Sequence, residues 1–161
     1  MYLGKITCNV LLALVDATPQ PILFAGKATE CLNKHYGLDT EMLSLVESAW
    51  SGGDSDEAAS TLVEEDQLEK LRPETLQRLK AIQDIIQEQL GYAPGEVSLR
   101  DAALVRWAAA LVVRRAARLS ACAVATVALQ MGYVTGLGKD ARSAEAPVVG
   151  GKPYVIGIDG R

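Results

Sequence analysis

Apolar and small residues follow a helical spacing over the longest uninterrupted stretch of the chain, residues 98–132. This stretch holds no proline, and its first glycine is Gly132, a residue type that often follows the last turn of a helix. Ser98 and Asp101 are spaced as in a capping box, with Asp in place of the usual Glu or Gln. The pattern predicts one helix of about 50 Å, which is long enough to be the spine of a larger domain.

Projection of this helix at about 100° per residue separates two faces. Basic residues lie within roughly 120° of arc: Arg100, Arg114, Arg115 and Arg118. Apolar residues that we expect to face a core cover much of the rest: Leu104, Ala108, Leu111, Leu119, Val124, Val127 and Met131. About 20 uncharged residues follow the last arginine, the length of a membrane span. Because small and polar residues dilute this window, a buried helix is favoured, and a membrane helix over 119–138 is the alternative.

The N-terminal part of the sequence predicts three more helices. Residues 1–17 are apolar on nearly every side, as in a buried helix. After an extended piece at 22–24, residues 27–36 form a short helix that Gly37 closes. Asp39 is well placed as the N-cap of a helix over 39–47.

Thr40 and Ser44 are four positions apart, so their hydroxyls lie on one face of the helix over 39–47. Spacing alone is typical of small polar residues near a helix start, and a ligand role is the alternative. Further on, Pro73 stands at or near the first turn of an amphipathic helix that Gly91 ends. Its expected core stripe is Leu76, Leu79, Ile82, Ile86 and Leu90, and Lys80 and Asp84 have the spacing of an ion pair.

Three segments differ in character from these helices. Residues 51–70 are polar and acidic, which predicts a surface loop. Residues 135–152 are rich in Gly, Ala and Pro and predict a flexible connection to a strand at 154–160. Since the sequence begins inside a helical pattern and ends on a strand, we expect it to be part of a larger domain.

Composition fits a single folded unit. The chain has 161 residues, of which 49% are hydrophobic, 22% charged and 5% aromatic, so its core should be aliphatic and rich in alanine. A net charge of −4 argues against a nucleic-acid-binding surface. Cys8, Cys31 and Cys122 are far apart and odd in number, which favours free thiols and a cytoplasmic protein. No signal peptide is evident.

The residues by themselves show no catalytic constellation. We find no phosphate-cradling glycine loop, Ser-His-Asp set or suitably spaced carboxylate pair. His35 is the only histidine and has no partners at ligand spacing, so no metal site is predicted. Arg114 and Arg115 could bind an anion, although mid-helix arginines more often pair with acids or cover apolar surface.

Four segments, in order, resemble the second half of eukaryotic hexokinases, most closely the fungal glucokinase branch. They are Met1-Tyr-Leu-Gly4, residues 32–40, residues 105–121 with Arg-Arg-Ala-Ala-Arg-Leu-Ser at 114–120, and residues 154–160. Each segment alone is weakly specific. Four in order are a strong signal, and the resemblance as a whole extends over nearly the whole chain, excepting the acidic loop and the 135–152 connection.

The resemblance implies an α/β fold, of which residues 1–161 would be a mostly helical portion, with few strands, of an actin-like, ribonuclease-H-like sugar kinase large domain. It implies transfer of phosphate from ATP, with Mg²⁺, to the 6-hydroxyl of glucose or a related hexose in glycolysis. The family's catalytic Asp, sugar-binding residues and phosphate loops have no match here, so no catalytic residue is assigned. Thr40 and Ser44 match the family's nucleotide-contacting Thr and Ser.

Lys5 stands where the family usually has Glu, which reverses a charge. Two functions are therefore open: part of an active kinase whose isolated chain has no turnover, or a non-catalytic, kinase-derived protein that binds a partner. In both cases we expect uncovered apolar surface to favour self-association.

Overall fold

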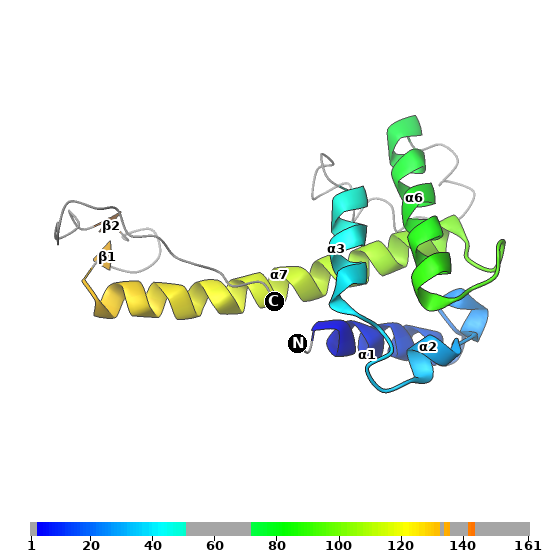
Figure 1. Cartoon of the computed structure of the whole chain (residues 1–161), viewed down its shortest axis with the longest axis horizontal. Coiled ribbons are helices and arrows are strands. Elements are labelled where there is room, and N and C mark those ends of the chain that lie inside the picture. Colours follow the sequence, from blue (N-terminus) through cyan, green and yellow to red (C-terminus); the bar gives the residue numbers. More distant parts are fainter. Residues whose placement is uncertain (1–2, 51–71, 133, 136–141, 144–161) are drawn as a thin grey trace. The chain divides into compact units, whose positions relative to one another are not determined.

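The structure is a computed structural model that describes residues 3–50, 72–132, 134–135 and 142–143 (Figure 1). The described helical elements are α1 (Leu3–Val15), the 3₁₀ turn η1 (Phe24–Gly26), α2 (Glu30–Asn33), α3 (Thr40–Ala49), α6 (Pro73–Leu90) and α7 (Leu99–Gln130). The chain divides into two compact units, Met1–Ala116 and Ala117–Arg161, and α7 contributes residues to both.

Strands in the described residues are limited to β1 (Val134–Thr135) and β2 (Arg142–Ser143), an antiparallel pair with Val134 opposite Ser143. The expectation of a mostly helical chain with few strands is confirmed for this part. The expected strand at 154–160, the acidic loop at 51–70 and most of the 135–152 connection lie outside the described residues. The actin-like sheet that the resemblance implies therefore stays a prediction.

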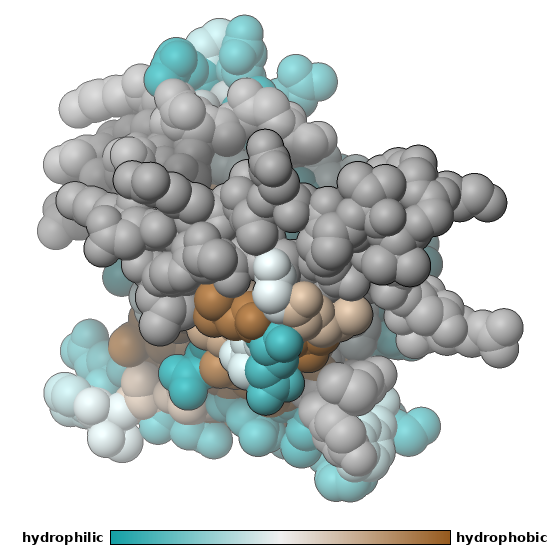
Figure 2. Space-filling model, turned by 90° about the vertical axis from the view of Figure 1, so that its left-hand side faces the viewer, coloured by the Kyte–Doolittle hydropathy of each residue, from teal (hydrophilic) through white to brown (hydrophobic). Residues whose placement is uncertain are grey.

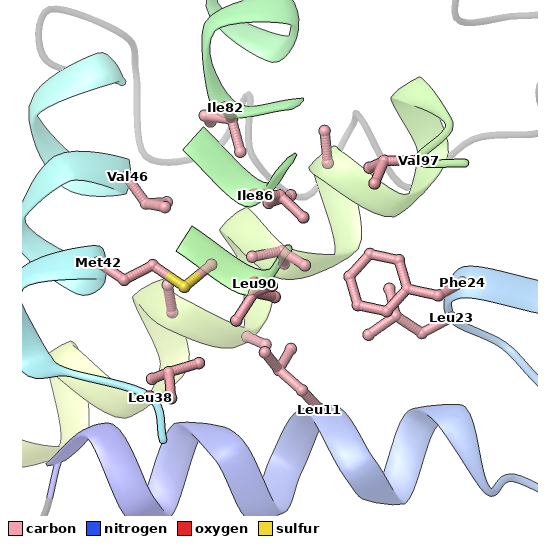
Figure 3. Close-up of a cluster of buried hydrophobic side chains, with 14 of the residues drawn as sticks. Leu11, Leu23, Phe24, Leu38, Met42, Val46, Ile82, Ile86, Leu90 and Val97 are labelled. Atoms are coloured by element: carbon pink, nitrogen blue, oxygen red, sulfur yellow. The ribbon is translucent and has the colours of Figure 1, made fainter. Parts of the chain in front are cut away.

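The core of the first unit lies among α1, α3, α6 and the N-terminal half of α7. In Figure 1, α3 and α6 lie side by side and run in opposite directions, and both pack in the same cluster with α1. Figure 3 shows side chains of α1, α3, α6 and the connecting segments pointing toward one another. Those labelled are Leu11, Leu23, Phe24, Leu38, Met42, Val46, Ile82, Ile86, Leu90 and Val97. Alanines of α7 complete the core: Ala102, Ala103, Ala108 and Ala109.

The capping box predicted at the start of α7 is present. The backbone N–H of Asp101 donates to Ser98 Oγ at 3.1 Å, and the Ser98 N–H donates to Asp101 Oδ2 at 2.9 Å. Asp101 also makes a second contact, which its spacing in the sequence did not predict. Its Oδ1 accepts the backbone N–H of Phe24 at 2.8 Å, so one buried carboxylate joins α7 to a distant turn.

That turn differs from the extended piece expected at 22–24. Leu23 is extended, but Phe24 and Ala25 have φ values of 52° and 48°, in the left-handed region that favours glycine. The Phe24 ring packs on Tyr92 with 4.3 Å between centroids, and the Tyr92 hydroxyl donates to the Lys27 carbonyl at 2.7 Å. Burial raises the pKa of Tyr92. The costly backbone conformation is thus held by tertiary contacts.

The N-terminal helices are present but differ in detail from the prediction. In α1 one face is buried, through Gly4, Thr7, Cys8, Leu11 and Val15, whereas Ile6 is exposed, so the expectation of burial on nearly every side is wrong. The helix expected at 27–36 is only the single turn of α2, where the Thr29 hydroxyl accepts the N–H of Leu32.

The helix α6 follows its prediction closely. Pro73 is in the first turn, and Gly91 ends the helix with a φ of 76°. Four of the five predicted stripe residues are buried, and the fifth, Leu76, is half-buried. Lys80 and Asp84 are both exposed, and within the described residues they form no ion pair.

The predicted apolar face of α7 is right only as far as Ala108. Ala108 is buried and Leu104 half-buried, but five other residues expected to face a core are exposed: Leu111, Leu119, Val124, Val127 and Met131. Figure 2 shows apolar side chains open to the surface on one face of the molecule. The four arginines of the predicted basic face are exposed as expected.

Among the described residues, no helix combines the length and apolar character that a membrane crossing needs. The three cysteines are free, as predicted. The thiol of Cys8 donates to the Leu32 carbonyl at 3.2 Å and that of Cys31 to the Gly37 carbonyl at 3.1 Å, which ties α1 and α2 into the core. Burial raises the pKa of the Cys31 thiol.

Replacement of Asp101 by Ala should destabilise the first unit strongly, because it breaks the α7 cap and leaves the buried Phe24 N–H unpaired. We expect the free energy of unfolding to fall by about 2–4 kcal/mol, measured by urea denaturation at pH 7. Asp84→Ala removes an exposed carboxylate from α6 and serves as the control. Equal losses in the two variants would contradict this role for Asp101.

Candidate functional site

The candidate site lies at the start of α3, where Thr40 and Ser44 are found. The Asp39 side chain caps this helix by accepting the N–H of Glu41 at 3.4 Å, as its position in the sequence predicted. Thr40 is half-buried and Ser44 is exposed. Both hydroxyls therefore belong to the outer side of α3, away from the residues that face the core, Met42, Leu43 and Val46.

The N-terminal end of α3 is fixed by α1. Gly4 of α1 lies directly against the backbone before α3: a Cβ added there would be 2.3 Å from the Leu38 carbonyl oxygen and 3.2 Å from the Asp39 carbonyl carbon. Both are backbone atoms, so they cannot move aside as a flexible side chain would. A side chain at this position is excluded, and the absence of one lets α1 define where α3 begins.

The C-terminal end of α3 is fixed by charged and aromatic contacts. Arg106 of α7 donates from Nη1 to Glu47 Oε1 at 2.8 Å. Its guanidinium carbon lies 5.5 Å from the ring centroid of Trp50, the C-cap of α3, and that of Arg78 lies 5.9 Å from the same ring. Such distances are in the range of cation–π contacts.

This cluster is buried on one side only. The side chain of Arg106 is 6% exposed, whereas that of Glu47 is 37% exposed. Burial lowers the pKa of Arg106, and Glu47 opposes that shift by favouring the charged form. Trp50 Nε1 and Arg106 Nε are buried without a hydrogen-bond acceptor. The ion pair is thus what compensates the burial of the arginine charge.

A pocket of about 310 Å³ opens between α3 and α6, lined by Ala49, Glu74, Gln77, Arg78 and Ala81. On a helical projection Ala49 lies on the opposite side of α3 from Thr40. The pocket and the two hydroxyls are therefore separate features of the helix.

The described residues contain no group of three or more His, Cys, Asp or Glu side chains that could hold a metal ion. His35 is exposed and contacts the ring of Tyr36, with 4.2 Å between ring centroids. Arg114 and Arg115, considered above for anion binding, are both exposed. The start of α3 therefore offers hydroxyls, first-turn backbone amides and the exposed carboxylates of Asp39 and Glu41.

Comparison with known protein families gives one result. A family model described as Hexokinase matches residues 1–161, the whole sequence. The chain belongs to the hexokinase family. No curated protein and no solved structure matches it. The family assignment that the four quoted segments predicted is confirmed, and with it a hexose phosphotransferase lineage.

The cluster of Arg106, Glu47 and Trp50 in this hexokinase-family chain was missed by reasoning from the sequence. Arg106 lies outside the arc occupied by the other α7 arginines, among residues that are apolar. A charged residue within an apolar helix face indicates a buried partner, and this signal was available. The identity of the partner was not, because Glu47 is 59 positions away.

Gly4→Ala tests how α1 holds α3. Alanine favours helix, but its methyl group would overlap the Leu38 carbonyl, so we expect the free energy of unfolding to fall by about 1–3 kcal/mol. Asn9→Ala, at an exposed position of the same helix, is the matched control and should leave stability unchanged or slightly raised. Thermal or urea unfolding of both variants checks this, and an unchanged G4A variant would contradict the close fit.

Proposed function

We propose that this chain is the large-domain portion of an ATP-dependent hexokinase, and that the α3 hydroxyls of Thr40 and Ser44 contact the nucleotide. The match to the hexokinase family over the whole sequence is the observation that carries the proposal. The exposure of Ser44 and partial exposure of Thr40 support it, because a ligand can reach both. The proposal includes that residues 1–161 all belong to this large-domain portion.

The chemistry at α3 suits a supporting role rather than a reactive one. Hydroxyls donate and accept hydrogen bonds without charge, and the first-turn amides of a helix favour negative charge. Asp39 and Glu41 on the same turn oppose an anion there. Thr40 and Ser44 would therefore orient the nucleotide. Mg²⁺ would enter with the ATP phosphates, and glucose or a related hexose would be bound by residues without a match here.

We infer that phosphoryl transfer needs groups other than those in these 161 residues, since the reaction requires a positioned base and a phosphate cradle. On the resemblance of the quoted segments we also propose a finer place in the family, near fungal glucokinases. It predicts a preference for glucose in any longer protein that carries this sequence, which a panel of hexoses in a coupled assay would test.

Binding of Mg²⁺ with the ATP analogue β,γ-imido-ATP, measured by calorimetry on the 161-residue chain, tests the nucleotide role. Loss of both hydroxyls in a Thr40→Ala, Ser44→Ala variant should weaken binding about tenfold. Ser120→Ala removes an exposed helical hydroxyl elsewhere and should have no effect. If the chain does not bind, or the double variant binds as tightly, the nucleotide role is wrong.

The same chain should form no hexose 6-phosphate above background in a coupled assay with ATP and glucose, because binding groups alone do not stabilise the transition state. Turnover would show that reactive groups are present that we have not recognised. Absence of both turnover and nucleotide binding would favour the second function, a kinase-derived protein that binds a partner. The motivating observations for it are the acidic sequence at 51–70 and Lys5 in place of Glu.

Self-association through exposed apolar residues is a further expectation. Leu119 and Val127 of α7 are 64% and 53% exposed, and surfaces of this kind favour association. The mean mass from sedimentation velocity should rise with concentration, and the Leu119→Gln, Val127→Gln variant should reduce that rise. Ala121→Gln, at an exposed small residue, is the control. A monomer at all concentrations would contradict the expectation.

A further inference from the structure

The inference concerns Arg106, and it rests on the proposed nucleotide role of α3. Among the described residues, four polar or charged side chains are buried, and Arg106 is the only base of the four. A buried guanidinium is costly unless it is paired, and pairs of this kind are often no more stabilising than apolar residues of the same size. Stability alone therefore does not explain its presence in a mostly aliphatic core.

The geometry of α3 supplies an explanation for the buried Arg106. Thr40, Ser44 and Glu47 have the spacing i, i+4, i+7, so they lie along one face of the helix within about 60° of arc. Arg106 binds Glu47 at the C-terminal end of that face, at 2.8 Å. The ion pair therefore fixes the rotation of α3 about its own axis on the face that carries the two hydroxyls.

The neighbouring contacts give the ion pair a defined position. Arg106 also lies against the Trp50 ring, which is 2% exposed, and Arg78 of α6 lies against the same ring. The C-terminal end of α3 is thus joined to α6 and α7, while Gly4 of α1 fixes its N-terminal end. A helix held at both ends keeps the Cα–Cβ bonds of Thr40 and Ser44 pointing in one direction.

We propose that Arg106 is a positioning residue for nucleotide binding: through Glu47 and Trp50 it sets the rotation of α3 and hence the direction of the Thr40 and Ser44 hydroxyls. It acts through α3 and does not contact the nucleotide itself. Glu47, which is half-exposed, is the partner through which the orientation is transmitted.

The test uses the 161-residue chain with Arg106→Met, which keeps the apolar stem, and Glu47→Gln, a milder change should R106M fold poorly. Two quantities are measured well below the unfolding transition: amide hydrogen exchange of residues 41–47 without nucleotide, and affinity for Mg²⁺ with β,γ-imido-ATP. Arg115→Met, at an exposed arginine of the same helix, is the matched control. Arg106→Lys restores the charge and should recover part of the affinity.

We expect R106M and E47Q to speed amide hydrogen exchange in α3 and to weaken nucleotide binding about fivefold or more. In a background that already carries Ser44→Ala, the same two substitutions should weaken nucleotide binding less. Equal weakening with and without Ser44 would show a merely structural role and overturn the inference. Unchanged exchange and affinity would overturn it as well. If the wild-type chain does not bind nucleotide, the proposed function fails and so does the nucleotide part of the inference, while exchange still reports whether Arg106 holds α3.

Discussion

The carboxylate of Asp101 joins two segments that are 77 residues apart, and the first unit depends on this connection. One oxygen closes the cap of α7 and the other holds the N–H of Phe24, whose backbone lies in the left-handed region. Because a buried unpaired N–H is costly, neither the turn nor the helix start is independent of the other. Phe24 then packs on Tyr92, which brings the segment after α1 against the loop between α6 and α7.

Around this connection the core is built from helices that approach closely. Alanines on the buried face of α7 leave room for the aliphatic residues of α1, α3 and α6. The fit of Gly4 against the Leu38 carbonyl is one such contact, since a single methyl group would be excluded. Close contacts of this kind fix the position of α3, which matters for the proposed function because α3 carries Thr40 and Ser44.

Membership of the hexokinase family connects the position of α3 with the proposed function. In the proposed function, α3 presents two uncharged hydroxyls to a nucleotide, and the groups that perform the reaction are supplied by other residues. Phosphoryl transfer depends on positioning more than on covalent chemistry. A helix that is capped at one end, and bound by Glu47–Arg106 and Trp50 at the other, is suited to that task.

Local patterns in the sequence determined the longer helices and several of their ends, although not the short extent of α2. Asp39, Pro73, Gly91 and the Ser98 capping box act on groups within a few residues, so their roles could be predicted from spacing, as could the buried stripe of α6. The quoted segments also determined the family.

Only the tertiary structure decided which apolar residues are covered and which charged residues are paired. Leu119 and Val127 have the same helical spacing as buried residues, yet they are exposed, because burial depends on a neighbour and not on periodicity. The bond from Asp101 to Phe24 and the ion pair of Arg106 join residues far apart in the chain. Both contacts form because a polar or charged group that loses its water inside a packed core needs a partner there, and no local pattern in the sequence specifies that partner.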